Sequence, residues 1–124
     1  VLNTMKRAIF AVPLLLSAVA CSRSEPVDPE ILEAGRQVYL AQCCGGCHGE
    51  NRAGSELAPP LTSVHLHWSA ERLETYLKHP EAVTASEPRL KDLSSRWELE
   101  MPGVEEASPE DVRALALFLL HSRD

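Results

Sequence analysis

Residues 43–48 read Cys-Cys-Gly-Gly-Cys-His, and this stretch decides what the rest of the chain folds around. Two thiols, those of Cys44 and Cys47, stand three positions apart, and His48 follows the second directly. A disulfide-exchange pair would need a strand and helix context of the thioredoxin kind, and a zinc site would need a second pair of ligands at metal-binding spacing. The sequence offers neither context, whereas C-x-x-C-H is the pattern of covalent haem attachment.

Attachment of a haem c gives each residue of this pattern a chemical role. The thiols of Cys44 and Cys47, at the end of a helix, can reach the two vinyl groups of one haem, and His48 then lies under the iron as an axial ligand. Cys43 lacks the spacing for a vinyl bond. We therefore interpret Cys43 as a bystander, either buried or open to misattachment and oxidation.

The composition favours a small all-α protein with a cofactor in its interior. The 124 residues suffice for one ordinary domain, only 5% of them are aromatic, and nine prolines imply short helices joined by irregular loops. A chain of this size and composition has too little apolar mass for a full core. A haem would supply that mass, and we expect three to five short helices with long loops wrapped around it.

The N-terminal residues 1–20 read as a secretory signal peptide. Met5 is the expected start, and two cations precede an apolar run that is too short to span a bilayer as a stable helix. Small residues then lead to Cys21, which also resembles the acylated cysteine of bacterial lipoproteins. Cleavage with a lipid on Cys21, cleavage without one, and a retained anchor stay open.

The chain that remains after such cleavage is acidic. Removing residues 1–20 takes away two of the 12 basic residues and none of the 18 acidic ones, which leaves a formal charge of −8. This charge repels phosphate backbones and excludes nucleic acid as a partner, but it favours docking on a basic protein surface. We expect residues 21–28 to form a short tether and residues 29–122 to form the folded domain.

Helix-start signals divide that domain. Asp28, Ser69 and Ser108 can each cap the free amides of a first helical turn. Gly35 falls inside the first helix, where glycine is unfavourable unless another backbone passes close to it, so we expect a helix crossing there. The predicted helices span residues 29–42, 69–79, 89–95 and 109–122.

Over residues 29–122 the chain resembles the small monohaem cytochromes c of class I. The resemblance implies the cytochrome c fold, in which the first and last helices touch at a glycine and in which Tyr39 and Phe118 would pack at the crossing. It depends on features that follow one another in the family's order: Gly35 and Tyr39, the C-x-x-C-H pattern, Pro59-Pro60-Leu61, Trp68 with its helix, Met101-Pro102, and Leu115, Phe118 and Leu119 in the last helix.

The resemblance also implies partners for the haem. A methionine ligand on the second face of the iron would be Met101, since the other methionine lies in the predicted signal, and the carbonyl of Pro60 would accept from the other ring nitrogen of His48. The carbonyl of the preceding residue, Pro59, is the alternative acceptor for this ring nitrogen. Other candidates are His65, His67, His79 and His121 as replacement ligands, and Trp68, Trp97, Tyr76 and Arg52 as donors to the haem propionates.

The function implied is single-electron transfer, not enzymatic catalysis. Iron with imidazole and thioether ligands has no open position for a substrate, and the methionine ligand raises its reduction potential. The expected partners are redox proteins, of respiratory kind, in the bacterial periplasm, with membrane contact only through a lipid on Cys21. The alternatives are a haem subunit fixed in a dehydrogenase or oxidase complex and a haem-based gas or redox sensor.

Overall fold

The computed structural model describes residues 25–122, and within them the chain is helical with no strand. The predicted signal peptide and Cys21 lie outside the described residues, as does the first half of the predicted tether, residues 21–24. The all-α prediction is confirmed, but residues 25–122 form six α-helices instead of the three to five expected. The elements, in chain order, are α1 (Pro29–Ala41), α2 (Gly45–His48), a 3-10 turn η1 (Val64–Leu66), α3 (Ala70–Lys78), α4 (Pro80–Ser86), α5 (Pro88–Ser94) and α6 (Pro109–His121).

Three helices begin where the sequence predicted, because the capping side chains act as expected. Asp28 accepts from the backbone N–H of Glu30 at the start of α1. Ser69 caps α3 and Ser108 caps α6 in the same way. Each hydroxyl or carboxylate satisfies an amide that has no partner inside its helix.

Helix α4 was missed by the sequence analysis. Pro80 follows the end of α3, which lies two positions earlier, at Lys78. The same proline also occupies the first position of α4, where a missing N–H costs nothing. The predicted helix over residues 89–95 corresponds to α5, which also begins at a proline, Pro88.

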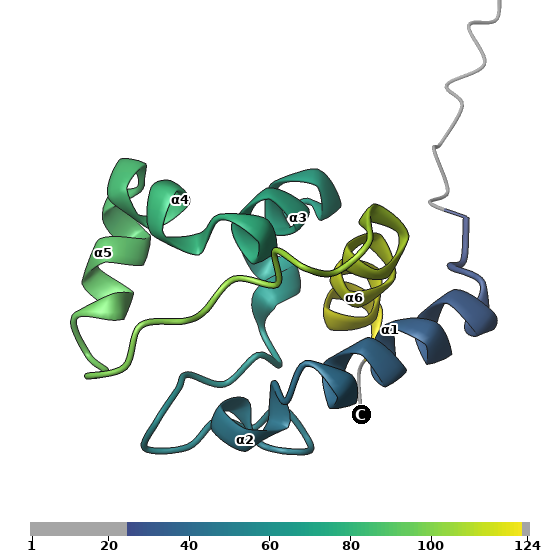
Figure 1. The fold of residues 1–124 in the computed structure, drawn as a ribbon, viewed down its shortest axis with the longest axis horizontal. Coiled ribbons are helices and arrows are strands. Elements are labelled where there is room, and N and C mark those ends of the chain that lie inside the picture. Colours follow the sequence, from purple (N-terminus) through teal and green to yellow (C-terminus); the bar gives the residue numbers. More distant parts are fainter. Residues whose placement is uncertain (1–24, 123–124) are drawn as a thin grey trace, which may run out of the picture.

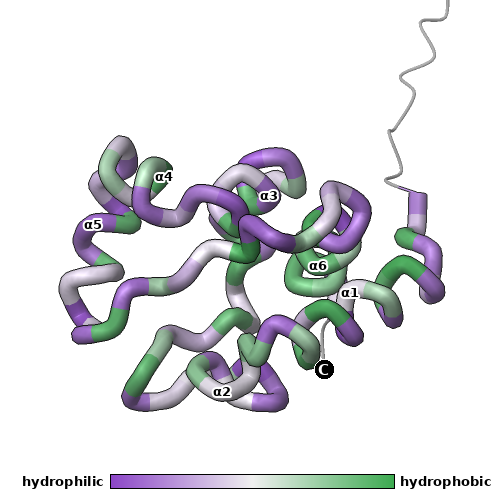
Figure 2. The backbone as a smooth tube through the Cα atoms, viewed as in Figure 1, coloured by the Kyte–Doolittle hydropathy of each residue, from purple (hydrophilic) through white to green (hydrophobic). Residues whose placement is uncertain are grey.

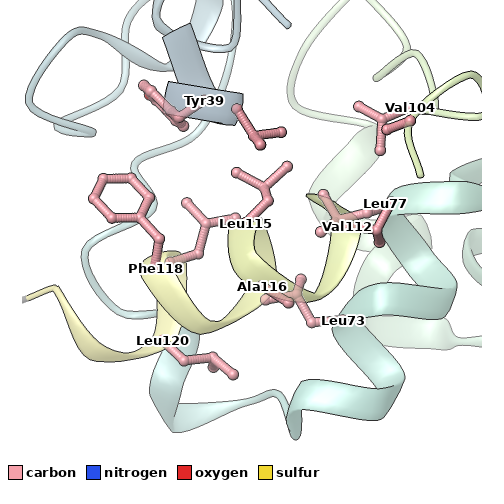
Figure 3. Packing of buried hydrophobic residues seen from close by; sticks show 12 residues of the cluster. Tyr39, Leu73, Leu77, Val104, Val112, Leu115, Ala116, Phe118 and Leu120 are labelled. Carbon is pink, nitrogen blue, oxygen red and sulfur yellow. The ribbon is translucent and has the colours of Figure 1, made fainter. Parts of the chain in front are cut away.

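The first and last helices, α1 and α6, cross at Gly35, as the sequence predicted (Figure 1). A Cβ atom added at Gly35 would lie 2.5 Å from the Cβ of Phe118 and would also overlap the carbonyl oxygen of Ala114. The rings of Tyr39 and Phe118 pack beside this crossing, with centroids 5.8 Å apart and a tilt of 58° (Figure 3). The close approach therefore depends on the absence of a side chain at Gly35.

The hydrophobic core lies around α6, which is the most apolar helix (Figure 2). Leu115, at its centre, is fully buried, and residues of α3 and of the loop before α6 close over it (Figure 3). Helices α4 and α5 lie at the opposite end of the molecule from α1 (Figure 1). The core cluster comprises Val38, Tyr39, Leu73, Leu77, Val104, Ala107, Val112, Leu115, Ala116, Phe118, Leu119 and Leu120.

Candidate functional site

A turn at the end of α1 positions the attachment sequence. Cys43 has a left-handed backbone (φ 57°), its N–H donates to the carbonyl of Leu40, and the N–H of Cys44 donates to the carbonyl of Tyr39. These two bonds form the Schellman arrangement that ends many helices, with Cys43 in the position usually taken by glycine. Cys43 is exposed, so its part in the site is to turn the chain before Cys44.

Helix α2 is a single turn that brings the site residues together. The N–H groups of Cys47 and His48 both donate to the carbonyl of Cys44, at 3.2 and 2.9 Å. Residues three apart on a helix share a face, so we expect the thiols of Cys44 and Cys47 on the same side of the turn, although only Cys44 of the two lines the cavity beside His48. Ser55 Oγ donates to the carbonyl of Cys47 at 2.6 Å and ties the following loop to the turn.

The surroundings of Cys44 disfavour its thiolate form. Burial raises its pKa above the ordinary value, and the neighbouring sulfurs of Cys43 and Cys47 raise it further, against a lowering by a backbone hydrogen bond. Reactive cysteines of disulfide oxidoreductases have lowered pKa values. Among residues 25–122, moreover, no group of three or more His, Cys, Asp or Glu side chains could hold a metal ion. Neither the redox-pair nor the zinc alternative gains support.

His48 is buried and its ring orientation is fixed. Its Nδ1 lies 2.7 Å from the carbonyl oxygen of Pro59. A carbonyl oxygen only accepts, so Nδ1 carries the proton and Nε2 keeps the lone pair that can bind a metal. The expected partner, Pro60, was wrong by one position: Pro60 lines the cavity, but its neighbour Pro59 supplies the carbonyl.

The loop that presents Pro59 is shaped by a glycine. Gly54 has a left-handed backbone (φ 83°), and a Cβ atom there would lie 2.6 Å from the nitrogen of Pro60. Its N–H donates to the carbonyl of His48 at 2.8 Å. Gly54 thus lets the loop fold back tightly enough for a proline carbonyl to reach the imidazole.

A cavity of about 360 Å³ lies beside His48. Met101 lines the same cavity, partly buried against the core. Of the four histidines considered as alternative ligands, His67 is the one that lines it. The cavity walls come from every helix except α4, and from the loops between them: Tyr39, Cys44, His48, Pro59, Pro60, Leu61, Ser63, Val64, His67, Trp68, Leu73, Tyr76, Leu77, Arg89, Leu90, Leu93, Arg96, Trp97, Met101, Leu115 and Leu119.

The loop that carries Met101 is fastened to the end of α3. Lys78 donates from Nζ to the carbonyls of Ala107, at 2.7 Å, and Glu105, at 3.1 Å. The N–H of Val104 donates to the carbonyl of Leu77 at 2.8 Å. These bonds bring a segment without regular structure to a defined place at the cavity.

Three of the four candidate donors to the haem propionates line the cavity. Trp68, Tyr76 and Trp97 line the cavity, although the indole N–H of Trp97 donates to the carbonyl of Ser55 at 3.4 Å. Arg52 does not line it: its Nη1 donates to the carbonyl of Ser122 and its guanidinium stands over the ring of Phe118. Arg52 instead joins the attachment loop to the end of α6.

Two cavity residues, Arg89 and Arg96, were missed by the sequence analysis. Arg96 is exposed and pairs with Asp92 at 2.6 Å. A nitrogen of Arg89 is buried without a hydrogen-bond partner among the described residues. They come from α5 and the loop after it, where periodicity was too weak to orient any side chain.

Together these features suit a haem. The cavity is apolar over most of its wall, His48 offers Nε2 to it, Met101 lines the same space, and Nη2 of Arg89 is buried without a hydrogen-bond partner among residues 25–122. Ligand cavities combine such apolar walls with a few fixed polar groups. The fold and the site therefore define an all-α haem-binding protein.

Comparison with known proteins identifies the family. The sequence model of the family described as Cytochrome c matches residues 32–123, and the chain belongs to this family. It therefore binds haem c covalently and takes part in haem-based electron transfer with redox partner proteins. Searches of curated proteins and of solved structures found no match.

Proposed function

We propose that this protein is an exported single-electron carrier of class I, with one haem c attached through Cys44 and Cys47 and bound by His48 and Met101. The observation that carries the proposal is the joint placement of His48 and Met101 on one apolar cavity. A haem iron with imidazole and thioether ligands exchanges one electron between its ferrous and ferric states.

Residues of the chain fix the orientation of His48 and keep the cavity apolar. The carbonyl of Pro59 holds the proton on Nδ1 of His48, which fixes the tautomer that binds metal and increases the basicity of Nε2. Leu73, Leu77 and Leu115 close the cavity toward the core and exclude water. A dry, pre-arranged wall keeps reorganisation small when the charge on the cofactor changes.

Mass spectrometry and visible spectra of the haem protein test the residue assignments. Cys44→Ala and Cys47→Ala should each lose one thioether bond, whereas Cys43→Ala should keep the mass and spectrum of the parent. Met101→Ala should change the low-spin spectrum, and an unchanged spectrum would remove Met101 from the ligand set. Readily bound carbon monoxide on the ferrous parent protein at neutral pH would contradict a closed carrier and favour a sensor.

We also propose export to the bacterial periplasm, where a tether from Cys21 would hold the domain near respiratory partners if that cysteine carries a lipid. The signal-like residues 1–20 support export. No helix among residues 25–122 has the length and apolarity needed to cross a membrane. The mass of the mature N-terminus decides between a lipidated and a free Cys21, and intact residues 1–20 in the purified protein would contradict cleavage.

The acidic charge of the mature chain supports docking on a basic partner. The formal charge of −8 that remains without residues 1–20 should speed association with such a surface at low ionic strength. Electron transfer to a basic partner should therefore slow as salt screens the attraction. Rates that stay constant over a wide range of salt would contradict electrostatic docking, and co-purification with a fixed partner would favour a subunit of a larger complex.

A further inference from the structure

Arg89 lines the cavity and carries a buried hydrogen-bond donor there. Within residues 25–122, its Nη2 is a buried side-chain nitrogen that has no hydrogen-bond partner. An arginine keeps its charge in proteins, and a buried charged donor without a partner costs free energy. The cavity side of α5 therefore presents a donor that an anion would satisfy.

The orientation of Arg89 is set by aromatic residues. Its guanidinium carbon stands 5.5 Å from the ring centroid of Trp68, at cation–π distance, and Trp68 also packs on Tyr76 with centroids 5.0 Å apart. Arg72 lies 5.9 Å from the same indole and is paired with Glu87, near the start of α5. The contact with Trp68 orients the guanidinium of Arg89, and its Nη2 is left without a hydrogen-bond partner among residues 25–122.

The carboxylates near Arg89 already have other partners. Glu87 pairs with Arg72, and Asp92 pairs with Arg96 at 2.6 Å. The missing anion therefore has to enter the cavity with its ligand. A haem carries two propionate carboxylates, and a guanidinium binds a carboxylate through two parallel N–H groups.

We propose that Arg89 binds a propionate carboxylate of the haem. The inference rests on the proposed haem site, and it replaces Arg52, which the sequence analysis considered for this role. Arg96 lines the same cavity but is exposed and paired, so Arg89 is the fixed anchor. Arg89 acts on the iron only through the propionate, which makes it a positioning residue.

The pairing has a consequence for the reduction potential. A neighbouring cation lowers the pKa of a carboxyl group and keeps it ionised around neutral pH. The same cation offsets the carboxylate charge, which would otherwise favour ferric over ferrous iron. Loss of Arg89 should therefore lower the potential and raise the propionate pKa, so that the potential falls as pH rises through that pKa.

The midpoint potential of the haem protein, measured from about pH 5 to 9, tests the proposal. Arg89→Gln should shift the ratio of oxidised to reduced protein about tenfold at neutral pH, equivalent to about 59 mV for one electron, and should add a pH-dependent step. Arg89→Lys should restore most of the potential. Arg96→Gln is the matched control, because it removes the same charge from the same cavity without adding the step.

Other groups around the cavity could titrate in such an experiment. Its titratable or charged side chains are Tyr39, Cys44, His48, His67, Tyr76, Arg89 and Arg96, with Arg72, Glu87 and Asp92 behind them. His67 lines the cavity, and histidine is the side chain that most often changes charge around neutral pH. The series is therefore repeated with His67→Gln, and a step that persists there belongs to the propionate.

The outcomes separate this inference from the proposed function. A normal c-type spectrum with superimposable potential curves for the parent and Arg89→Gln would overturn the role of Arg89 alone. A protein without a c-type spectrum would overturn the haem site itself. If Arg89→Gln yields no haem protein, Arg89→Lys is measured in its place. A midpoint potential equal to that of the parent at every pH supports the role of the charge. A fall in potential equal to that of Arg96→Gln contradicts it.

Discussion

Arg52 and Ser122 are joined by a hydrogen bond of 2.7 Å from Nη1 to the backbone carbonyl, across 70 positions of sequence. Ser122 is the C-cap of α6, so the guanidinium lies at the negative end of the helix dipole. The same group stands 4.9 Å from the ring centroid of Phe118. The attachment loop, the last helix and the α1 crossing are thereby linked through one side chain.

Arg52→Leu should reduce the free energy of unfolding by about 2–4 kcal/mol, because it removes a charged hydrogen bond and a cation–π contact. Arg52→Lys should reduce the free energy of unfolding by less, since lysine keeps the charge although it lacks the planar guanidinium group. Denaturant unfolding of the haem protein measures both. Arg36→Leu is the control, because Arg36 pairs with Glu33 on an exposed face of α1. Equal losses for Arg52→Leu and Arg36→Leu would contradict the special position of Arg52.

Gly35→Ala should destabilise the protein by about 2–3 kcal/mol, the usual range for overpacking a tight contact. The new methyl group would meet the Cβ of Phe118 and the backbone of Ala114, neither of which can rotate away. Gly46→Ala makes the same exchange in α2, where a Cβ meets nothing within 4 Å. Thermal unfolding of the two haem proteins should therefore differ, and similar midpoints would argue against a close crossing.

Lys78→Met should loosen the loop that carries Met101, because two carbonyls of that loop lose their shared cationic donor. A charged hydrogen bond contributes about 1.5–3 kcal/mol, so the ferric protein should bind added imidazole at least about tenfold more tightly as Met101 yields. Spectral titration with imidazole measures this affinity.

Lys91→Met serves as the control for that titration, since Lys91 is exposed on α5. Lys78→Arg should raise the imidazole affinity less than Lys78→Met does, because the guanidinium can still donate to the loop. An unchanged imidazole affinity in Lys78→Met would show that the bond from Val104 to Leu77 holds the loop by itself.

The fold was predictable from the sequence where signals were local. Capping residues located the starts of α1, α3 and α6, and Gly35 indicated the helix crossing. Helix α4 was not predictable in the same way, because its seven residues bury only Pro80. A helix that short owes its existence to its neighbours and leaves almost no periodic pattern.

The site was predictable only where residue chemistry is distinctive. The pattern of cysteines and histidine located one wall, and Met101 lines the same cavity, whereas its role as a ligand stays a prediction. The roles of Arg52 and Arg89 could not be assigned, because each depends on where the tertiary fold turns a long side chain. The one-residue error at Pro60 has a similar cause, since the sequence does not encode which of two adjacent carbonyls faces the ring.

Tyr39 links the helix crossing to the attachment loop and should make stability fall at high pH. Its hydroxyl donates to the carbonyl of Gly49 at 2.6 Å. The pKa of Tyr39 is raised to about 12, mainly because the side chain is buried. The unfolded chain loses this proton near the ordinary tyrosine pKa of about 10, while the folded chain still holds it. The free energy of unfolding should therefore decrease between about pH 10 and 12, by up to about 1.4 kcal/mol per pH unit.

Tyr39→Phe should remove most of this pH dependence and should cost about 1 kcal/mol at neutral pH, because the carbonyl of Gly49 loses one donor. The pKa of Tyr76 is also raised by burial, so some alkaline dependence should remain in the variant, and Tyr76→Phe provides the matched comparison. Denaturant unfolding followed by circular dichroism, from neutral to alkaline pH, measures each slope. A slope in Tyr39→Phe equal to that of the parent would show that the proton lost on alkaline unfolding comes from another group.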